Sequence, residues 1–213
     1  MASTMIHLAV AYRLQQSGGL LSKMIVNRGS YYLGAVAPDA VNLDGFASKQ
    51  VRWAAHLREK TPREWYVSAE HFYKKQQEAG YPDRELLLGY LVHILTDAAF
   101  DETIHDPIWA AAAKAARLAG ETVDGKEEGW EECFRFDRSQ MHAFWWTGIV
   151  KPAFANASPQ AIGTIPSELL ERYQDHLLYL YEKELPKEPP RVITPEMVWL
   201  LGDYVESILE PML

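Results

Sequence analysis

Apolar residues recur three or four positions apart along most of the chain, and no segment shows the strict alternation of a half-buried strand. This period is typical of helices that pack around a common core. With capping residues, Gly and Pro as boundaries, the pattern predicts helices over residues 4–16, 20–27, 61–79, 82–106, 108–119, 131–146, 167–185 and 194–210. Since no linker separates them, we expect an all-α, single-domain helical bundle that spans residues 1–213.

The segments between these helices differ in what they predict. Residues 31–39 are apolar but contain Gly34 and Pro38, so a buried loop is expected there. Residues 121–129 are charged and are expected to form a loop. Residues 49–60, which include His56, fit a short helix or a loop equally.

The expected helix over residues 82–106 has the most unusual pattern. It is apolar on almost every side, yet it carries His93, Asp97, Asp101 and His105 at intervals of four residues. Each such interval turns an α-helix by about 400°, so the four side chains form one slowly drifting stripe. A helix that is hydrophobic all round belongs inside a domain, where ionisable groups are costly unless they are paired, hydrogen-bonded or bound to a metal. We therefore expect the bundle to be built around this buried helix.

Composition narrows the class of protein. Of the 213 residues, 48% are hydrophobic, which is enough for a sizeable core, and the net charge of −8 argues against nucleic-acid binding. The single cysteine, Cys133, excludes a disulfide framework and a cysteine-based zinc cluster. The first residues lack a basic region followed by an unbroken apolar run. We accordingly expect no signal peptide, no membrane insertion and a cytoplasmic protein.

Several His and Asp residues lie in apolar surroundings and could bind a divalent ion through imidazole and carboxylate. His93 and Asp97 are one helical turn apart, His7 lies on the first expected helix, Asp39 follows a proline, and His56 lies in a third segment. Each also has an ordinary interpretation. His7 and His93 fit core histidines, and Asp97 fits a buried, capped carboxylate. Asp39 fits a turn or helix cap, and His56 fits a surface residue. The pattern alone leaves these alternatives open.

The same residues resemble the zinc-dependent phospholipase C family, and in particular its small, single-domain bacterial members. The likeness rests on the order of four motifs: His7, then Gly34-Ala35-Val36-Ala37-Pro38-Asp39, then His56, then Gly89-x-x-x-His93-x-x-x-Asp97. It covers about the first half of the chain. It implies a helical bundle around a zinc cluster and an enzyme that hydrolyses phosphoester bonds.

The resemblance also implies roles for single residues. Asp39, His56, His93 and Asp97 would form one metal site, and Asp97 would bridge to a second ion held by His7. One or two zinc ions are expected, or another divalent metal in their place. Asp39 would also accept the proton of the attacking water and so be the catalytic residue. The expected substrate is a small phosphoester, and a phospholipid head group is suggested by the family name only. The oligomeric state is left open.

Some features depart from the family or could support the site. The third metal position of secreted relatives, held by a His-x-x-x-Glu motif, has no counterpart here, and Asp101, His105 and Asp106 are insecure replacements. Thr96 and Tyr90 are candidates for orienting the imidazoles, or are packing residues.

Two functions are alternatives to a phospholipase C-like hydrolase. The adjacent pair His105-Asp106 is reminiscent of HD-type metal phosphohydrolases, but Pro107 follows directly, whereas that motif normally lies inside a helix. The second alternative is a non-catalytic helical protein whose metal site is structural or vestigial. A structural site is closed, whereas a catalytic one keeps a position for water.

Overall fold

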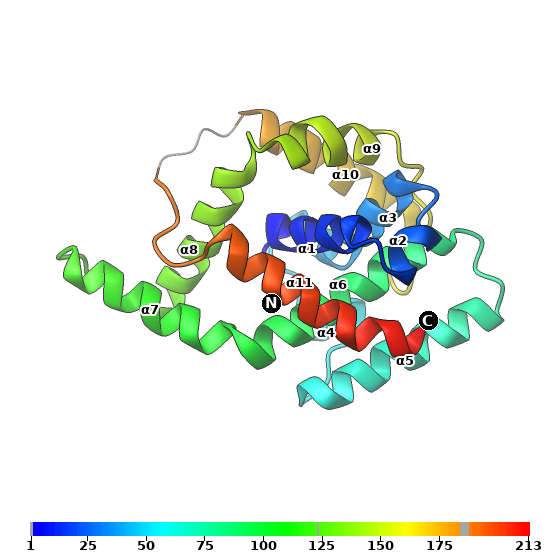
Figure 1. Cartoon of the computed structure of the whole chain (residues 1–213), viewed down its shortest axis with the longest axis horizontal. Coiled ribbons are helices and arrows are strands. Elements are labelled where there is room, and N and C mark those ends of the chain that lie inside the picture. Colours follow the sequence, from blue (N-terminus) through cyan, green and yellow to red (C-terminus); the bar gives the residue numbers. More distant parts are fainter. Residues whose placement is uncertain (1, 123, 184–187) are drawn as a thin grey trace.

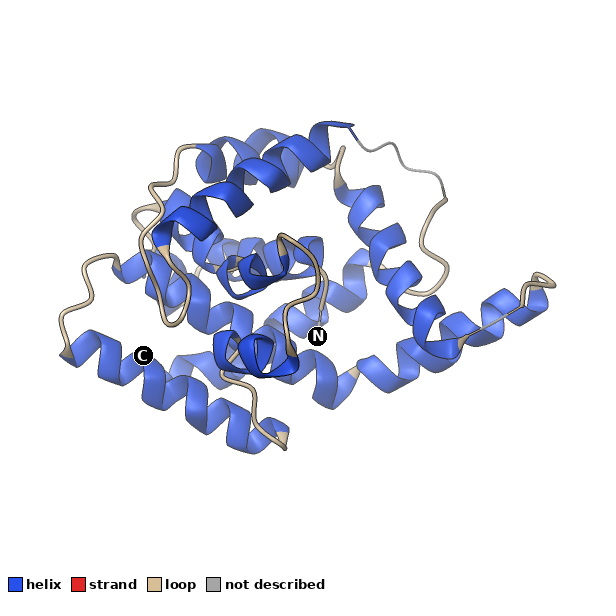
Figure 2. Ribbon diagram, turned by 180° about the vertical axis from the view of Figure 1, so that it is seen from behind, coloured by secondary structure: helices blue, strands red, loops and turns tan. Residues whose placement is uncertain are grey.

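The regular structure of the protein is helical, as the sequence predicts (Figure 1, Figure 2). The computed structural model describes residues 2–122, 124–183 and 188–213. Within these ranges there is no strand, and β-type pairing is limited to an isolated antiparallel bridge between Ile162 and Ile165. The all-α prediction is confirmed.

The helices follow one another in the order α1 (Thr4–Gln16), α2 (Leu20–Met24), α3 (Arg28–Gly34), η1 (Ala37–Asn42), α4 (Lys49–Ala55), α5 (Pro62–Glu78), α6 (Arg84–Thr103), α7 (His105–Leu118), α8 (Gly125–Gln140), η2 (Trp145–Val150), α9 (Lys151–Ala155), α10 (Ser167–Lys183), α11 (Pro195–Leu209) and η3 (Glu210–Met212). The elements η1 and η3 are 3₁₀-helices, and η2 is a π-helix.

The bundle is organised around α6, as expected. Every residue from Leu86 to Phe100 is buried, and α6 packs against α3, α5 and α11. Asp83 caps its first turn by accepting a hydrogen bond from the backbone N–H of Leu86. The second interior helix, α1, lies in the middle of the bundle in Figure 1 and packs against α11, α8 and α6. These two helices place their buried faces at the centre of the molecule.

The predicted buried loop over residues 31–39 is wrong in its secondary structure, although the segment is buried. It consists of the end of α3 and the start of η1. Asn27 caps α3, and Pro38 occupies the first turn of η1, where its missing N–H costs no hydrogen bond. Gly34 is therefore a packing residue at the end of a helix rather than a helix breaker.

Gly34 and Gly89 allow α3 and α6 to touch along their backbones. A Cβ atom on Gly89 would lie 2.0 Å from the carbonyl oxygen of Tyr31, and one on Gly34 would lie 2.2 Å from that of Leu86. Both distances are far inside van der Waals contact, so neither position can carry a side chain without moving a helix. This close packing fixes η1, which follows α3, relative to α6.

Other helix boundaries also differ from the prediction. The central helix ends at Thr103 and a new helix, α7, begins at His105. The helix is therefore interrupted at Ile104, three residues before Pro107. The expected loop over residues 121–129 is wrong, because Asp124 caps α8 and the helix begins at Gly125. α8 ends at Gln140 rather than at residue 146. α2 ends at Met24 rather than at residue 27.

Helices with strong local signals are where the sequence places them. Thr61 and Glu64 form the expected capping box of α5, and Thr194 caps α11. Of the ambiguous residues 49–60, Lys49–Ala55 form α4, His56 is its C-terminal cap, and the residues after it form a loop. The predicted end of the helix at residue 185 lies outside the described residues. In the part of the chain that the structure describes, no helix combines the length and the apolarity that a bilayer crossing requires.

Candidate metal centre

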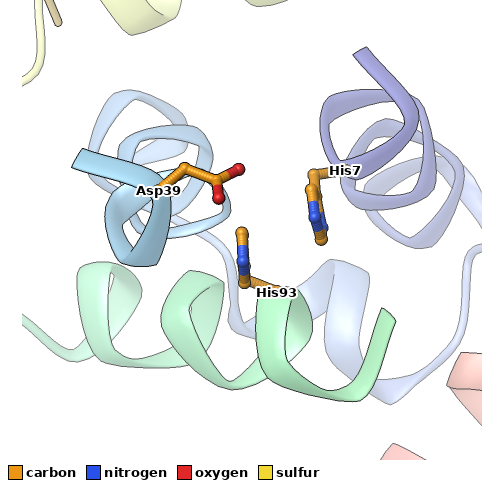
Figure 3. Close-up of side chains that lie close together, drawn as sticks. All are labelled: His7, Asp39 and His93. Carbon is orange, nitrogen blue, oxygen red and sulfur yellow. The ribbon is translucent and has the colours of Figure 1, made fainter. Parts of the chain in front are cut away.

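The structure brings together all five residues that the sequence singles out for metal binding. His7 comes from α1, Asp39 from η1, His56 from the end of α4, and His93 and Asp97 from adjacent turns of α6. Figure 3 shows that His7, Asp39 and His93 point toward one another from three separate elements. The four helical elements thus converge on one buried point.

The ligand atoms of these residues form two overlapping groups. One atom each from His7, Asp39 and His93, and one each from His56, His93 and Asp97, lie within 4.8 Å of one another. His93 belongs to both groups. Such spacings would allow each group to hold a metal ion.

The two oxygens of Asp97 face different partners. Oδ1 lies 3.4 Å from His7 Nε2 and accepts a hydrogen bond of 2.7 Å from the backbone N–H of Ala2. Oδ2 lies 3.7 Å from His93 Nε2 and 3.9 Å from His56 Nε2. The carboxylate therefore stands between His7 on one side and His56 and His93 on the other, as a bridging ligand would.

Hydrogen bonds to backbone carbonyls fix which nitrogens of two imidazoles carry protons. His93 Nδ1 lies 2.9 Å from the carbonyl oxygen of Ala35, and His56 Nδ1 lies 2.8 Å from that of Arg52. Because a carbonyl only accepts, both Nδ1 atoms are the donors. In the neutral rings the lone pairs are then on Nε2 and point into the site, which is the arrangement of metal-binding histidines.

Several polar atoms of the site are buried without a hydrogen-bond partner among the described residues. They are both ring nitrogens of His7, Nε2 of His93 and Oδ2 of Asp97. A buried polar atom without a partner costs about 1–3 kcal/mol, and here several of them face one another. The lone pair of His93 Nε2 faces the negative Asp97 Oδ2, which is repulsive unless a cation lies between them. This donor set fits a divalent ion.

Burial and neighbouring charges shift the pKa values of these groups in different directions. Burial, followed by the repulsion of a charge on His7, lowers the pKa of His93 to about 3, so its imidazole stays neutral. Burial alone would raise the pKa of Asp97, but the nearby imidazoles, His7 first, hold it well below its usual value. The result at neutral pH is a carboxylate and a neutral imidazole, the forms that coordinate metals.

His56 and Asp39 form a closer pair at the edge of the site. His56 Nε2 lies 3.2 Å from Asp39 Oδ1, and the Asp39 side chain is 17% exposed. Burial lowers the pKa of His56, but the hydrogen bond and charge of Asp39 outweigh this and raise it. Burial likewise opposes ionisation of Asp39, and the bond to His56 reverses the sign and lowers its pKa. Without a metal, a shared proton holds this pair together.

Backbone contacts around the site hold its residues in position. The Trp65 indole N–H donates a hydrogen bond of 2.7 Å to the carbonyl oxygen of His56, and the Tyr90 hydroxyl donates to that of Ala55. Tyr90 therefore supports the end of α4 rather than an imidazole directly. The Thr96 hydroxyl donates to the carbonyl oxygen of Val92 on its own helix, so it orients none of the three histidines.

The three insecure candidates lie apart from the cluster. Asp101 pairs with the guanidinium of Arg58, and His105 Nδ1 lies 2.8 Å from Asp106 Oδ1. The Asp106 side chain is 95% exposed, and none of the three belongs to either group of converging ligand atoms. His105 and Asp106 are the first two residues of α7, with Pro107 in its first turn, so the pair lies at the start of a helix and not inside one. The exposure of Asp106 is a second observation against an HD-type site.

A cavity of about 220 Å³ lies beside the centre and is lined in part by Asp39. Its other walls come from the N-terminal segment, α8 and α10, and include Ser3, Asp137 and Tyr173. Asp137 is 7% exposed and is a residue that the sequence analysis missed. The one available signal was its position four residues after the buried Cys133 on a helix, which places it on the inward face.

Comparison with protein-family models, with curated proteins and with solved structures finds no match for the chain.

Proposed function

We propose that the protein is a metal-dependent phosphoester hydrolase. Its metal, for which zinc is the first candidate, is held by His7, Asp39, His56, His93 and Asp97. The observation that carries the proposal is the cluster of inward-facing lone pairs that have no partner, Nε2 of His93 and Oδ2 of Asp97 among them. The order of these residues along the chain, which resembles that of the zinc-dependent phospholipase C family, supports it independently.

The two overlapping groups of ligand atoms support one or two ions. With both carboxylates ionised and the imidazoles neutral, Asp39 and Asp97 give the site two negative charges, which a single divalent ion balances. Asp97 faces His7 with one oxygen and His56 and His93 with the other. This division supports a shared carboxylate. Hard oxygen and imidazole nitrogen ligands without thiolate fit zinc, with other divalent metals as alternatives.

The chain's own residues account for the remaining steps. An ion in this site would act as a Lewis acid and supply a nucleophilic oxygen from water at neutral pH. Asp39 is the ligand that also lines the cavity, so a substrate and its water reach it first. Its carboxylate accepts the proton of the attacking water.

The cavity also supports a substrate class. Its lining includes polar groups of Asp39, Ser3 and Asp137 together with apolar side chains such as Phe46, Leu43 and Trp130. This combination suits a small phosphoester with an apolar substituent. A phospholipid head group is one such substrate.

Metal analysis combined with hydrolysis tests the proposal. Purified protein is chelated, reloaded with zinc and assayed on p-nitrophenyl phosphomonoester and phosphodiester substrates. We expect zinc-dependent hydrolysis in the wild type and its loss in Asp97→Asn, while Asp203→Asn, which alters an exposed carboxylate paired with Arg13, stays active. Bound zinc without hydrolysis would instead identify a structural or vestigial centre, and absence of bound zinc would refute both.

A further inference from the structure

The cavity beside the metal centre contains a second buried carboxyl group. Asp137 on α8 accepts hydrogen bonds at Oδ1 from the Ser3 hydroxyl, at 2.6 Å, and from the backbone N–H of Met5, at 3.2 Å. Both bonds go to one oxygen, and they anchor the group to the chain that leads into α1. Asp137 and Asp39 line the same cavity from opposite elements, α8 and η1.

Among the described residues, Asp137 has no cationic partner. On its own helix, the Arg138 guanidinium reaches Glu131 Oε1 at 2.6 Å, and Arg135 faces Glu131, Glu132 and Glu188. A buried carboxylate without a counter-charge is costly, and the group avoids that cost by keeping its proton.

In the metal-free protein, the Asp39 carboxylate is the facing group that favours the neutral acid. Asp39 on η1 brings negative charge, and Tyr173 and His176 on α10 line the same cavity. Burial, and after it the charge of Asp39, raise the pKa of Asp137 to about 7. The hydrogen bonds from Ser3 and Met5 and the charge of Arg138 lower this pKa but do not outweigh the rise. The buried thiol of Cys133 on the same helix has a raised pKa and adds no charge.

We propose that Asp137 is the acid that donates a proton to the leaving alcohol oxygen of the phosphoester. This role rests on the proposed function. As the bond between phosphorus and the leaving oxygen breaks, its electron pair goes to that oxygen, which takes the Asp137 proton and departs as the alcohol. Asp137 is left as a carboxylate, and water restores its proton, while the proton of the attacking water goes to Asp39. Two carboxyl groups in one cavity thus divide the work of base and acid.

The division follows from their surroundings. Asp39 is paired with an imidazole, which keeps it ionised, whereas Asp137 accepts hydrogen bonds from a hydroxyl and an amide and has no cationic partner in the part of the chain that the structure describes. A proton donor matters most when the leaving group is a poor one, because an acidic phenol departs without protonation. Leaving-group dependence therefore separates an acid from a residue that only supports the fold.

The experiment compares zinc-loaded wild type, Asp137→Asn and Glu132→Gln on phosphodiesters that release p-nitrophenol, phenol or an alkyl alcohol. Glu132 is the matched control, because it is a fully buried carboxylate on the same helix that accepts from backbone N–H groups of Val192 and Ile193, as an amide oxygen still can. We expect Asp137→Asn to keep its zinc and its p-nitrophenyl rate within a few-fold, and to lose about 100-fold or more on the alkyl ester. Glu132→Gln should show no such dependence.

A second variant, Ser3→Ala, keeps Asp137 and tests the donor role through the pH dependence of hydrolysis. The Ser3 hydroxyl lowers the pKa of Asp137, so Ser3→Ala should move the alkaline decline of phenyl-ester hydrolysis to higher pH. Infrared spectra should also show a carboxylic acid band that titrates in the wild type and is missing from Asp137→Asn.

The outcomes separate the two proposals. An inactive wild type refutes the hydrolase function and the donor role that rests on it. An active wild type with equal losses on all three esters in Asp137→Asn, or with zinc lost from that variant, refutes the donor role alone. The donor role is also refuted if Ser3→Ala leaves the alkaline decline of phenyl-ester hydrolysis at the same pH. It is likewise refuted if the wild type shows no titrating carboxylic acid band.

Discussion

The imidazole rings of His7 and His93 are stacked, with centroids 3.7 Å apart and planes 9° from parallel. At this distance two imidazolium ions would repel each other strongly in a buried site. The stack is therefore compatible with neutral rings, and it joins α1 to α6 through the residues that we propose as ligands. Protonation of this pair should work against the fold.

The first prediction concerns the pH dependence of stability in the chelated protein. The pKa of His93 is lowered from 6.5 to about 3 on folding, so between these values the unfolded chain binds a proton that the folded chain does not. The contribution of His93 to the free energy of unfolding is accordingly lost as pH falls below 6.5, by up to about 1.4 kcal/mol per pH unit.

Urea unfolding at several pH values between about 6.5 and about 5 measures this slope. His93→Asn, whose amide N–H can replace Nδ1–H, should have the shallower slope, while the exposed His142→Asn should match the wild type. Equal slopes in His93→Asn and wild type would show that His93 protonates freely in the folded protein.

The second prediction separates the two roles of Asp39. An amide oxygen in Asp39→Asn can still coordinate a metal weakly but cannot take a proton at neutral pH. Hydrolysis should therefore fall by about 100-fold or more while most of the zinc stays bound. Parallel measurement of zinc content and kcat tests this. Equal losses of zinc and activity would make Asp39 a ligand only.

The third prediction tests the helix contact that positions the site. Gly89→Ala would place a Cβ atom 2.0 Å from the Tyr31 carbonyl oxygen, so α3 must move away from α6. We expect the free energy of unfolding to drop by about 3 kcal/mol or more. Gly125→Ala is the control, since its Cβ would meet only the Ala113 Cβ at 3.8 Å. If both variants unfold at the same urea concentration, the close contact of α3 and α6 is refuted.

The fourth prediction concerns Asp97 in the presence and absence of metal. With chelator, Asp97→Ala loses the bond from the Ala2 N–H but is freed of a buried, partly unpartnered carboxylate, so stability should change by no more than about 1 kcal/mol. With zinc at about a hundred times its Kd, the wild type alone should gain about 2.7 kcal/mol.

Paired thermal melts of Asp97→Ala and wild type, each with chelator and with excess zinc, give this comparison. A large destabilisation of the chelated variant would identify Asp97 as a structural hydrogen-bonding residue and would remove the main support for a bridging carboxylate.

Local signals account for the parts of the fold that the sequence predicts well. The capping box of Thr61 and Glu64 marks the start of α5, and the N-cap Thr194 marks the start of α11. The role of Gly34 could not be predicted from local signals, because it allows a close contact with Gly89 on another helix. The start of α8 was missed for a similar reason, since Gly129 is packed against the Trp109 ring of α7.

The candidate site shows the same limit. The spacing of His93 and Asp97 is a property of one helix, and their juxtaposition could be predicted from the sequence. The extension of the stripe to His105 failed because it assumed that the helix continues past Ile104. Asp137 could not be foreseen as part of the cavity, because its partner Ser3 is 134 residues away along the chain.

The zinc content of reloaded protein tests the metal centre most directly. Protein is chelated, incubated with zinc, separated from free metal by gel filtration and measured by elemental analysis, beside His93→Ala and the exposed control His142→Ala. We predict about one or two zinc ions per chain in the wild type and in His142→Ala, and a clear loss in His93→Ala, because His93 belongs to both groups of ligand atoms. A wild type that retains less than about a tenth of an equivalent, or a His93→Ala variant that binds as much zinc as the wild type, would contradict the account.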